Sequence, residues 1–269
     1  MSVSEAASGP ALHVHAWGEA DAPRLVYLHG VTGHGGHARL LAEDWLADYR
    51  VLAPDLLGHG RSPWEPPWSI DAHLEAIVET VGAEPADWVA HSFGGRLAFE
   101  LAARRPELVR RLVLLDPAIH LPPRVGLFAA ENGRAERTYV SFDEAVEKRY
   151  DESQLHGAPR PLVEEELREH LYLAEDGRWR YRYCQAAVVA AYGEMSSHPP
   201  PFADGRVPTL LVLGADSYLP YDHLLDAHRE ALGDLLTVVT VEGGHTVLWD
   251  ALEETAEAIR AFLDSAPPR

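Results

Sequence analysis

Short apolar runs of β-favouring residues alternate with amphipathic helical stretches along most of this chain. Most of the runs are apolar throughout, which is typical of strands in a parallel sheet that is covered on both faces. The predicted strands are His13–Trp17, Leu25–His29, Val51–Pro54, Trp88–His91, Leu112–Leu115, Thr209–Leu213 and Leu236–Val241. The predicted helices are His37–Ala47, Ser69–Gly82, Gly94–Arg104, Tyr221–Gly233 and Val247–Asp264. This order predicts an α/β fold with a mostly parallel sheet flanked by helices.

The alternation stops after the strand that ends near Asp116. Prolines then interrupt charged stretches of helical character, and strands resume only at Thr209. We therefore expect a helical cap, or lid, of residues 119–203, inserted into an α/β core formed by residues 1–118 and 204–269. A chain of 269 residues is long enough for one such core and its insertion.

Charge and cysteine content exclude several classes of protein. The 23 Lys and Arg against 42 Asp and Glu give a net charge of −19, which repels nucleic acid and anionic membranes. Cys184 is the single cysteine, so no intramolecular disulfide is possible. The chain begins without a secretory signal and contains no apolar run of membrane-spanning length. We expect a cytoplasmic protein with neither nucleic acid nor membrane as a partner, and both a monomer and a homodimer remain open.

The segment Val89-Ala90-His91-Ser92-Phe93-Gly94-Gly95 lies where a predicted strand meets a predicted helix. Small residues at positions 90 and 94 permit a tight turn that exposes Ser92 as a nucleophile. A serine at such a junction also serves as a helix N-cap, so the segment alone leaves two roles open. It resembles the nucleophile elbow of the alpha/beta hydrolase fold family, with Ala90 in place of the first glycine of G-x-S-x-G.

Two further segments resemble that family in the expected order. Leu28-His29-Gly30-Val31 resembles its oxyanion loop, which implies that the backbone amides of Val31 and Phe93 bind the oxyanion and that His29 braces the loop. The segment from Asp55 to Ser62 resembles its D-x-x-G-x-G-x-S turn, which implies a structural role for Asp55 and Arg61. Asp55 and His59 have the residue types of a metal site but no supporting ligand cluster, so we expect no metal and no cofactor.

The resemblance also implies a general base and an acid that orients it. Glu242-Gly243-Gly244-His245-Thr246 follows the last predicted strand, and His245 is the implied base. Asp216 follows the strand that usually supplies the acid, although Ser217 stands where the family's G-x-x-D turn places it. Asp116, at the end of the strand after the nucleophile helix, is the alternative. We prefer Asp216.

A serine nucleophile implies acyl transfer to water through a Ser92 acyl-enzyme. The leading hypothesis is a serine hydrolase of small to medium, largely apolar carboxylic esters or lactones. Its substrate pocket is expected to include His91 together with Trp179 and Tyr183 of the predicted cap.

Two other functions remain open at this point. A C–C bond hydrolase of ring-cleavage products would use the same triad under the same cap, with cap arginines such as Arg124, Arg178, Arg180 and Arg182 binding substrate carboxylates. A non-catalytic small-ligand-binding protein on the same fold is the alternative from another class.

Overall fold

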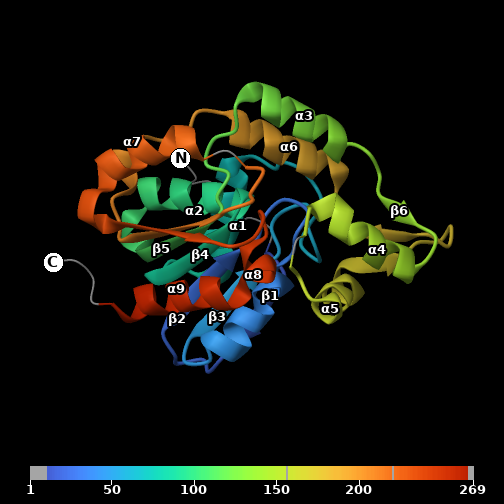
Figure 1. Ribbon diagram of the computed structural model, residues 1–269, viewed down its shortest axis with the longest axis horizontal. Helices are drawn as coiled ribbons and strands as arrows, with labels where there is room; N and C mark the ends of the chain where they lie inside the picture. The colour runs from blue at the N-terminus through green and yellow to red at the C-terminus, as the bar shows by residue number, and fades with distance from the viewer. Residues whose placement is uncertain (1–10, 156, 220, 266–269) are drawn as a thin grey trace, which may run out of the picture.

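The computed structural model describes residues 11–155, 157–219 and 221–265 (Figure 1). The first ten residues, on which the prediction of no secretory signal partly rests, lie outside the described residues. So do residues 266–269 at the end of the predicted core. Within the described part of the chain, no helix is both long and apolar enough to cross a membrane.

A seven-stranded sheet forms the centre of the molecule, and it confirms the α/β fold predicted from the sequence. Its strand order is β1-β3-β2-β4-β5-β9-β10, with every neighbouring pair parallel except β1 and β3. All seven predicted strands are present, with ends that differ by at most three residues. They are β1 (Val14–Trp17), β2 (Arg24–Leu28), β3 (Arg50–Pro54), β4 (Ala86–His91), β5 (Val109–Leu115), β9 (Thr209–Gly214) and β10 (Leu236–Val241).

Helices cover both faces of the sheet, as the uninterrupted apolar runs predict. Successive residues of β2 alternate between two apolar clusters: Leu25 belongs to the cluster on the face covered by α9 (Leu252–Asp264), and Val26 to the cluster under α1 (Ile70–Val81) and α2 (Phe93–Arg104). A further helix, α7 (Asp222–Leu232), packs at the edge of the second cluster.

Two predicted helices differ from the observed elements. The stretch His37–Ala47 forms a 3-10 helix, Gly35–Ala38, and a π-helical turn, Leu41–Trp45, in place of one α-helix. The predicted C-terminal helix is divided into α8 (Val247–Asp250) and α9 because Ala251 leaves the helical region, with φ −141° and ψ 53°. Both pieces face the same apolar cluster, so the apolar periodicity continues across the break and does not reveal it.

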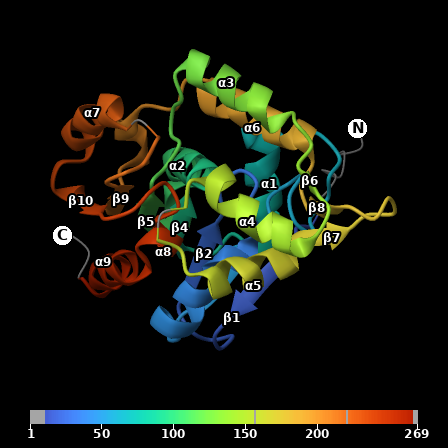
Figure 2. The same cartoon turned by 45° about the vertical axis from the view of Figure 1, so that its right-hand side comes forward.

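The segment between β5 and β9 contains more than the helices that the sequence predicts. We refer to residues 119–203 as the insertion. Its helices α3 and α6 lie side by side over one end of the sheet, while α4 and α5 lie beside it (Figures 1 and 2). A small antiparallel sheet, β6-β8-β7, joins them, and its strands of two or three residues are too short to show alternation in the sequence. The bounds are α3 (Pro123–Gly133), β6 (Thr138–Tyr139), α4 (Phe142–Ser153), α5 (Arg160–His170), β7 (Leu171–Leu173), β8 (Trp179–Tyr181) and α6 (Gln185–Ser196).

A buried arginine on α2 ties both ends of the insertion to the core. The Arg96 side chain is 1% exposed and forms an ion pair with Glu100 at 2.9 Å. Its Nη1 donates to the carbonyl oxygens of Ile119 at 2.6 Å and Ser197 at 3.1 Å, and Nη2 donates to the carbonyl of His198 at 3.3 Å. Ile119 is the first residue of the insertion, and His198 lies close to its last. One guanidinium therefore satisfies backbone carbonyls near both ends of the insertion.

We expect Arg96→Met to destabilise the protein by about 3 kcal/mol, because removing one partner leaves buried carbonyls and part of a buried carboxylate unsatisfied. Arg104→Met is the matched control, since Arg104 also contacts Glu100 but its side chain is 46% exposed. It should cost less than about 1 kcal/mol. Urea unfolding followed by circular dichroism measures both variants. Equal midpoints for the two variants would show that Arg96 does not anchor the insertion.

Candidate active site

Ser92 forms a one-residue turn between β4, which ends at His91, and α2, which begins at Phe93. Its backbone has φ 53° and ψ −116°, a conformation that is strained for any residue except glycine. The Ser92 side chain makes no capping hydrogen bond to α2. Ser92 therefore does not cap the helix through its hydroxyl, which was the other role that the sequence left open.

The turn also depends on the two glycines at positions 94 and 95. Because they have no side chains, neighbouring segments of the chain can pass directly against them. A Cβ on Gly94 would lie 2.4 Å from the Leu28 carbonyl oxygen, and one on Gly95 would lie 2.7 Å from Pro117 Cβ. Neither position has room for a side chain. The turn also tolerates Ala90, which is fully buried at the end of β4.

Three side chains form a continuous hydrogen-bonded chain at the carboxyl edge of the sheet. His245 follows β10, and its Nε2 lies 2.9 Å from Ser92 Oγ while its Nδ1 lies 2.6 Å from Asp116 Oδ2. The three residues are between 2% and 8% exposed. In this arrangement Nδ1–H donates to the carboxylate, which leaves the Nε2 lone pair directed at the serine hydroxyl.

The preference for Asp216 as the partner of His245 is not supported by this geometry, because Asp116 makes that hydrogen bond instead. Asp216 lies on an exposed turn after β9, where its backbone amide donates to the Gly243 carbonyl at 2.9 Å. Asp116 is buried at the end of β5, the strand that pairs with β9. The shortened turn after β9 therefore does not bring Asp216 to the imidazole, and the neighbouring strand supplies the carboxylate.

Ser217 takes a part in the site that the sequence did not predict. Its hydroxyl donates to Asp116 Oδ2 at 2.5 Å, and the Gly214 amide donates to Oδ1 at 3.1 Å. Ser217 stands at the position where the G-x-x-D turn would carry the acid. The sequence already showed that the usual position of the acid carries a serine. Only the pairing of β5 with β9 shows which carboxylate Ser217 contacts.

The predicted oxyanion loop packs directly on the serine. A Cβ on Gly30 would lie 2.9 Å from Ser92 Cβ, so the backbone beside Val31 passes close to the nucleophile position. His29 holds this loop: its Nδ1 donates to the Gly30 carbonyl at 2.7 Å and its Nε2 accepts from the Leu56 amide at 2.9 Å. Burial lowers the pKa of His29 well below its ordinary value, which keeps the ring neutral, as this pair of bonds requires.

Asp55 organises the loops on the other side of His29. Its Oδ1 accepts from the Gly35 amide at 2.7 Å and its Oδ2 from the Arg61 amide at 2.8 Å. Arg61 therefore contributes through its backbone. His59, which the sequence analysis weighed with Asp55 as a metal ligand, bonds the Leu57 carbonyl through Nδ1 at 3.0 Å.

The three residues predicted to line the substrate pocket lie in different places. His91 contacts the site, because its Nε2 donates to the His245 carbonyl at 2.9 Å. Trp179 packs on Phe142, and Tyr183 stacks on Tyr181, all within the insertion. Among the interactions of the described residues, none joins Trp179 or Tyr183 to Ser92 or His245.

Tyr218 is a site residue that the sequence did not predict. Its ring lies 5.0 Å from that of His245, measured between centroids, and 55% of the residue is exposed. Tyr218 follows Ser217 directly, so the same turn after β9 contacts both the acid and the imidazole. Nothing in its sequence neighbourhood distinguishes it from a loop tyrosine.

Comparison with known proteins agrees with the fold. Residues 23–252 match the sequence pattern of a family described as alpha/beta hydrolase fold. The chain is 35% identical over 257 residues to lipase LipV of Mycobacterium tuberculosis, covering 94% of this chain and 97% of the relative. It is 28% identical to a mouse sn-1-specific diacylglycerol lipase, ABHD11, covering 91% and 82%.

A solved structure shows the same fold. The crystal structure of E-2-(acetamidomethylene)succinate hydrolase superposes with a TM-score of 0.81 at 23% identity, covering 94% of this chain and 95% of that one. Together with the family match and the full-length similarity to a lipase, these observations show that the chain is a hydrolase that belongs to the alpha/beta hydrolase fold family.

Proposed function

We propose that this protein is a serine esterase that hydrolyses small to medium, largely apolar carboxylic esters or lactones without a cofactor. The observation that carries the proposal is the hydrogen-bonded chain from Ser92 through His245 to Asp116. This arrangement of nucleophile, base and orienting acid is that of acyl transfer through a covalent intermediate.

In the proposed reaction, Ser92 Oγ attacks the ester carbonyl carbon while His245 Nε2 takes the hydroxyl proton. The imidazolium then gives that proton to the leaving alkoxide oxygen as the acyl–oxygen bond to the alcohol breaks. Water, deprotonated by the same nitrogen, then attacks the acyl carbon. The bond to Ser92 Oγ breaks, the imidazolium returns the proton to Oγ, and the carboxylic acid is released. Asp116 stays ionised throughout, because its role is to fix the tautomer of His245 and to stabilise the imidazolium.

The backbone amides of Val31 and Phe93 are the proposed donors to the oxyanion. Phe93 is the first residue of α2 and has no preceding turn of helix to accept its N–H, while Val31 follows the glycine that packs on Ser92. Such a donor stabilises the transition state by about 3 kcal/mol. The position at the start of a helix adds a favourable dipole for a developing negative charge.

The proposed substrate class draws on the relatives and on the insertion. Both full-length relatives are named lipases, and lipases cleave esters with apolar acyl groups. We propose that residues 119–203 act as the cap over a core of residues 1–118 and 204–269, so that the acyl group binds between them. Tyr218 and His91, which contact His245, are then at the polar end of that space.

Two of the four arginines suggested for a C–C bond hydrolase, Arg178 and Arg180, are engaged elsewhere. Arg180 forms ion pairs with Asp176 at 2.7 Å and Glu136 at 2.7 Å, and Arg178 donates to Thr138 Oγ1 at 2.8 Å. These two guanidinium groups bind partners within the insertion, which argues against their binding a substrate carboxylate.

We expect the purified protein to hydrolyse p-nitrophenyl acetate and butyrate, and Ser92→Ala to lower kcat by about 10⁴-fold or more because the nucleophile is lost. A series of esters of increasing acyl length then ranks the substrates, and a vinylogous diketone acid tests C–C cleavage.

A fluorophosphonate probe should label the wild type at Ser92. Labelling without turnover of any ester would reject the ester assignment, and absence of both would favour the non-catalytic ligand-binding function.

Substitution of the two aspartates separates their roles. Asp116→Asn should lower kcat by roughly 10⁴-fold, because an amide no longer holds the Nδ1–H tautomer of His245. Asp216→Asn is the matched control and should stay within about threefold of the wild type, since the side chain is exposed and does not reach His245. The steady-state kcat on p-nitrophenyl butyrate measures both. A large loss in Asp216→Asn with normal activity in Asp116→Asn would overturn the assignment.

A further inference from the structure

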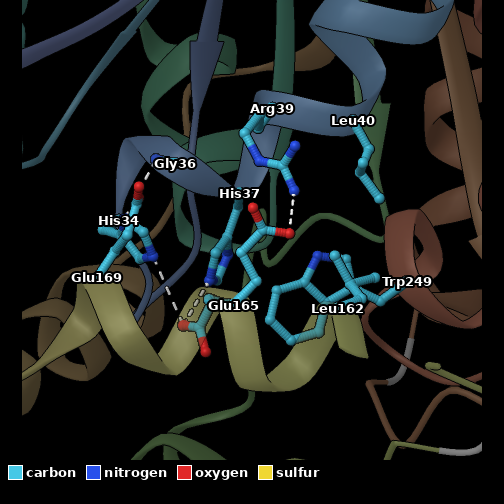
Figure 3. A pocket seen from close by; sticks show the side chains of 10 residues that line it. His34, Gly36, His37, Arg39, Leu40, Leu162, Glu165, Glu169 and Trp249 are labelled. Atoms are coloured by element: carbon cyan, nitrogen blue, oxygen red, sulfur yellow. Dashed lines mark hydrogen bonds and ion pairs between the residues drawn. The ribbon is translucent and has the colours of Figure 1, made fainter. Parts of the chain in front are cut away.

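Four titratable side chains meet where the insertion lies against the core, away from the Ser92 chain. His34 and His37 come from the 3-10 helix region after β2, and Glu166 and His170 come from α5. His34, Glu166 and His170 are each at most 7% exposed. Figure 3 shows His34 and His37 on the blue loop pointing toward the yellow helix α5. None of these four side chains has a part in the proposed reaction.

The spacing of these residues is suited to a shared ligand. Glu166 and His170 are four residues apart on α5, so they project from one face of the helix. The candidate ligand atoms of His34, Glu166 and His170 all lie within 4.8 Å of one another. In a tetrahedral zinc site, ligand atoms at 2.0–2.1 Å from the metal are about 3.3 Å apart. Metal binding would therefore bring the most widely separated of these atoms closer together by up to about 1.5 Å.

The polar atoms that converge here have no hydrogen-bond partners among the described residues. They are His34 Nε2, Glu166 Oε2 and both ring nitrogens of His170. His34 Nε2 lies 3.6 Å from Glu166 Oε1, which is beyond hydrogen-bond distance. Buried polar atoms are nearly always hydrogen-bonded, so an unpartnered group of this kind points to a missing ligand. Each neutral imidazole can offer one nitrogen lone pair, and the carboxylate oxygen offers another, which suits a cation. Two nitrogens with one oxygen suit zinc better than magnesium or calcium.

The remaining neighbours occupy the other carboxylate oxygen. His37 Nε2 donates to Glu166 Oε1 at 3.0 Å, and the guanidinium of Arg149 lies 3.6 Å from the same oxygen. Burial lowers the pKa of His37 to about 4, consistent with a neutral donor. Oε2 is thus left for a metal, with His37 orienting the carboxylate from behind. Arg149 opposes a cation by its charge and weakens the affinity.

We propose that His34 Nε2, Glu166 Oε2 and one ring nitrogen of His170 bind a Zn²⁺ ion that fastens α5 of the insertion to the core. Binding requires the proton of His34 to move to Nδ1, which releases the 3.2 Å hydrogen bond from the Gly36 amide. Because the ligands come from both segments, occupancy stabilises the contact between them. The unfolded chain lacks this arrangement, so zinc also raises the unfolding temperature.

A second group of His13, His15 and Asp55 lies nearby and serves as the rival site. Both oxygens of the Asp55 carboxylate already accept hydrogen bonds, from the Gly35 and Arg61 amides. A metal there would compete with bonds that hold two core loops. We therefore place the ion at His34, Glu166 and His170.

The test uses tag-free protein stripped with EDTA and titrated with ZnCl₂ by isothermal calorimetry and thermal denaturation. The wild type should bind one equivalent with a Kd of micromolar or tighter and melt several degrees higher with zinc than with EDTA. His170→Gln and Glu166→Gln should each weaken binding at least tenfold and lose the thermal shift. His73→Gln, a buried histidine on α1, and His15→Gln in the rival group should bind as the wild type does.

Unchanged binding in His170→Gln, loss of binding in His15→Gln, or no stoichiometric binding by the wild type would each overturn the proposal. If His170→Gln fails to fold, His34→Gln replaces it. Cobalt substitution of the wild type provides a readout without any variant: visible d–d absorption without a thiolate charge-transfer band supports nitrogen and oxygen ligands. A thiolate band would instead assign the metal to Cys184 and reject the site.

Discussion

The parallel pairing of β4, β5 and β9 is the constraint on which the site depends. Parallel strands end at the same edge of a sheet. The residues after β4, β5 and β9 therefore meet there although they are far apart in the sequence. Ser92, Asp116 and Ser217 stand at these three strand ends. His245, which follows β10 beside β9, completes the group. The chemistry therefore rests on strand order more than on any single motif.

The strained turn at Ser92 is held by close packing of backbone on both sides. The Leu28 and His29 carbonyls pass against Gly94, and Gly30 packs on Ser92 itself. A positive φ at a non-glycine residue costs roughly 1–3 kcal/mol, and the surrounding structure must supply that energy. The same packing brings the Val31 region close to Ser92, so the strained turn and the proposed oxyanion site depend on the same contacts.

The insertion is joined to the core by polar contacts at several points. Arg96 satisfies carbonyls at its two ends, and the Gly60 amide donates to the Arg182 carbonyl at 2.7 Å in the middle of it. The histidine and glutamate group between the 3-10 helix and α5 is a further junction. These contacts are directional and buried, so they fix how the insertion sits relative to the sheet edge where Ser92, His245 and Asp116 meet.

Much of the core followed from the sequence alone. The continuously apolar strands and the alternating helices predicted the α/β fold, and the residues around Ser92 and His245 suggested the family, because strand burial and tight turns leave local patterns in the sequence. The interrupted helix at Ala251 and the two- and three-residue strands of the insertion left no such pattern. Their apolar periodicity was either continuous across the break or too short to detect.

Tertiary structure alone decided which carboxylate meets His245. From the sequence, Asp216 and Asp116 were both acidic residues at strand ends, and the usual family position favoured Asp216. Burial and the β5–β9 pairing place Asp116 against Nδ1, with Ser217 donating from the position that the acid would otherwise occupy. The histidines of the 3-10 helix and the glutamate of α5 likewise came together only in the folded chain, since 129 residues separate His37 from Glu166. Local sequence determines which elements form, whereas contacts between distant elements depend on how those elements pack.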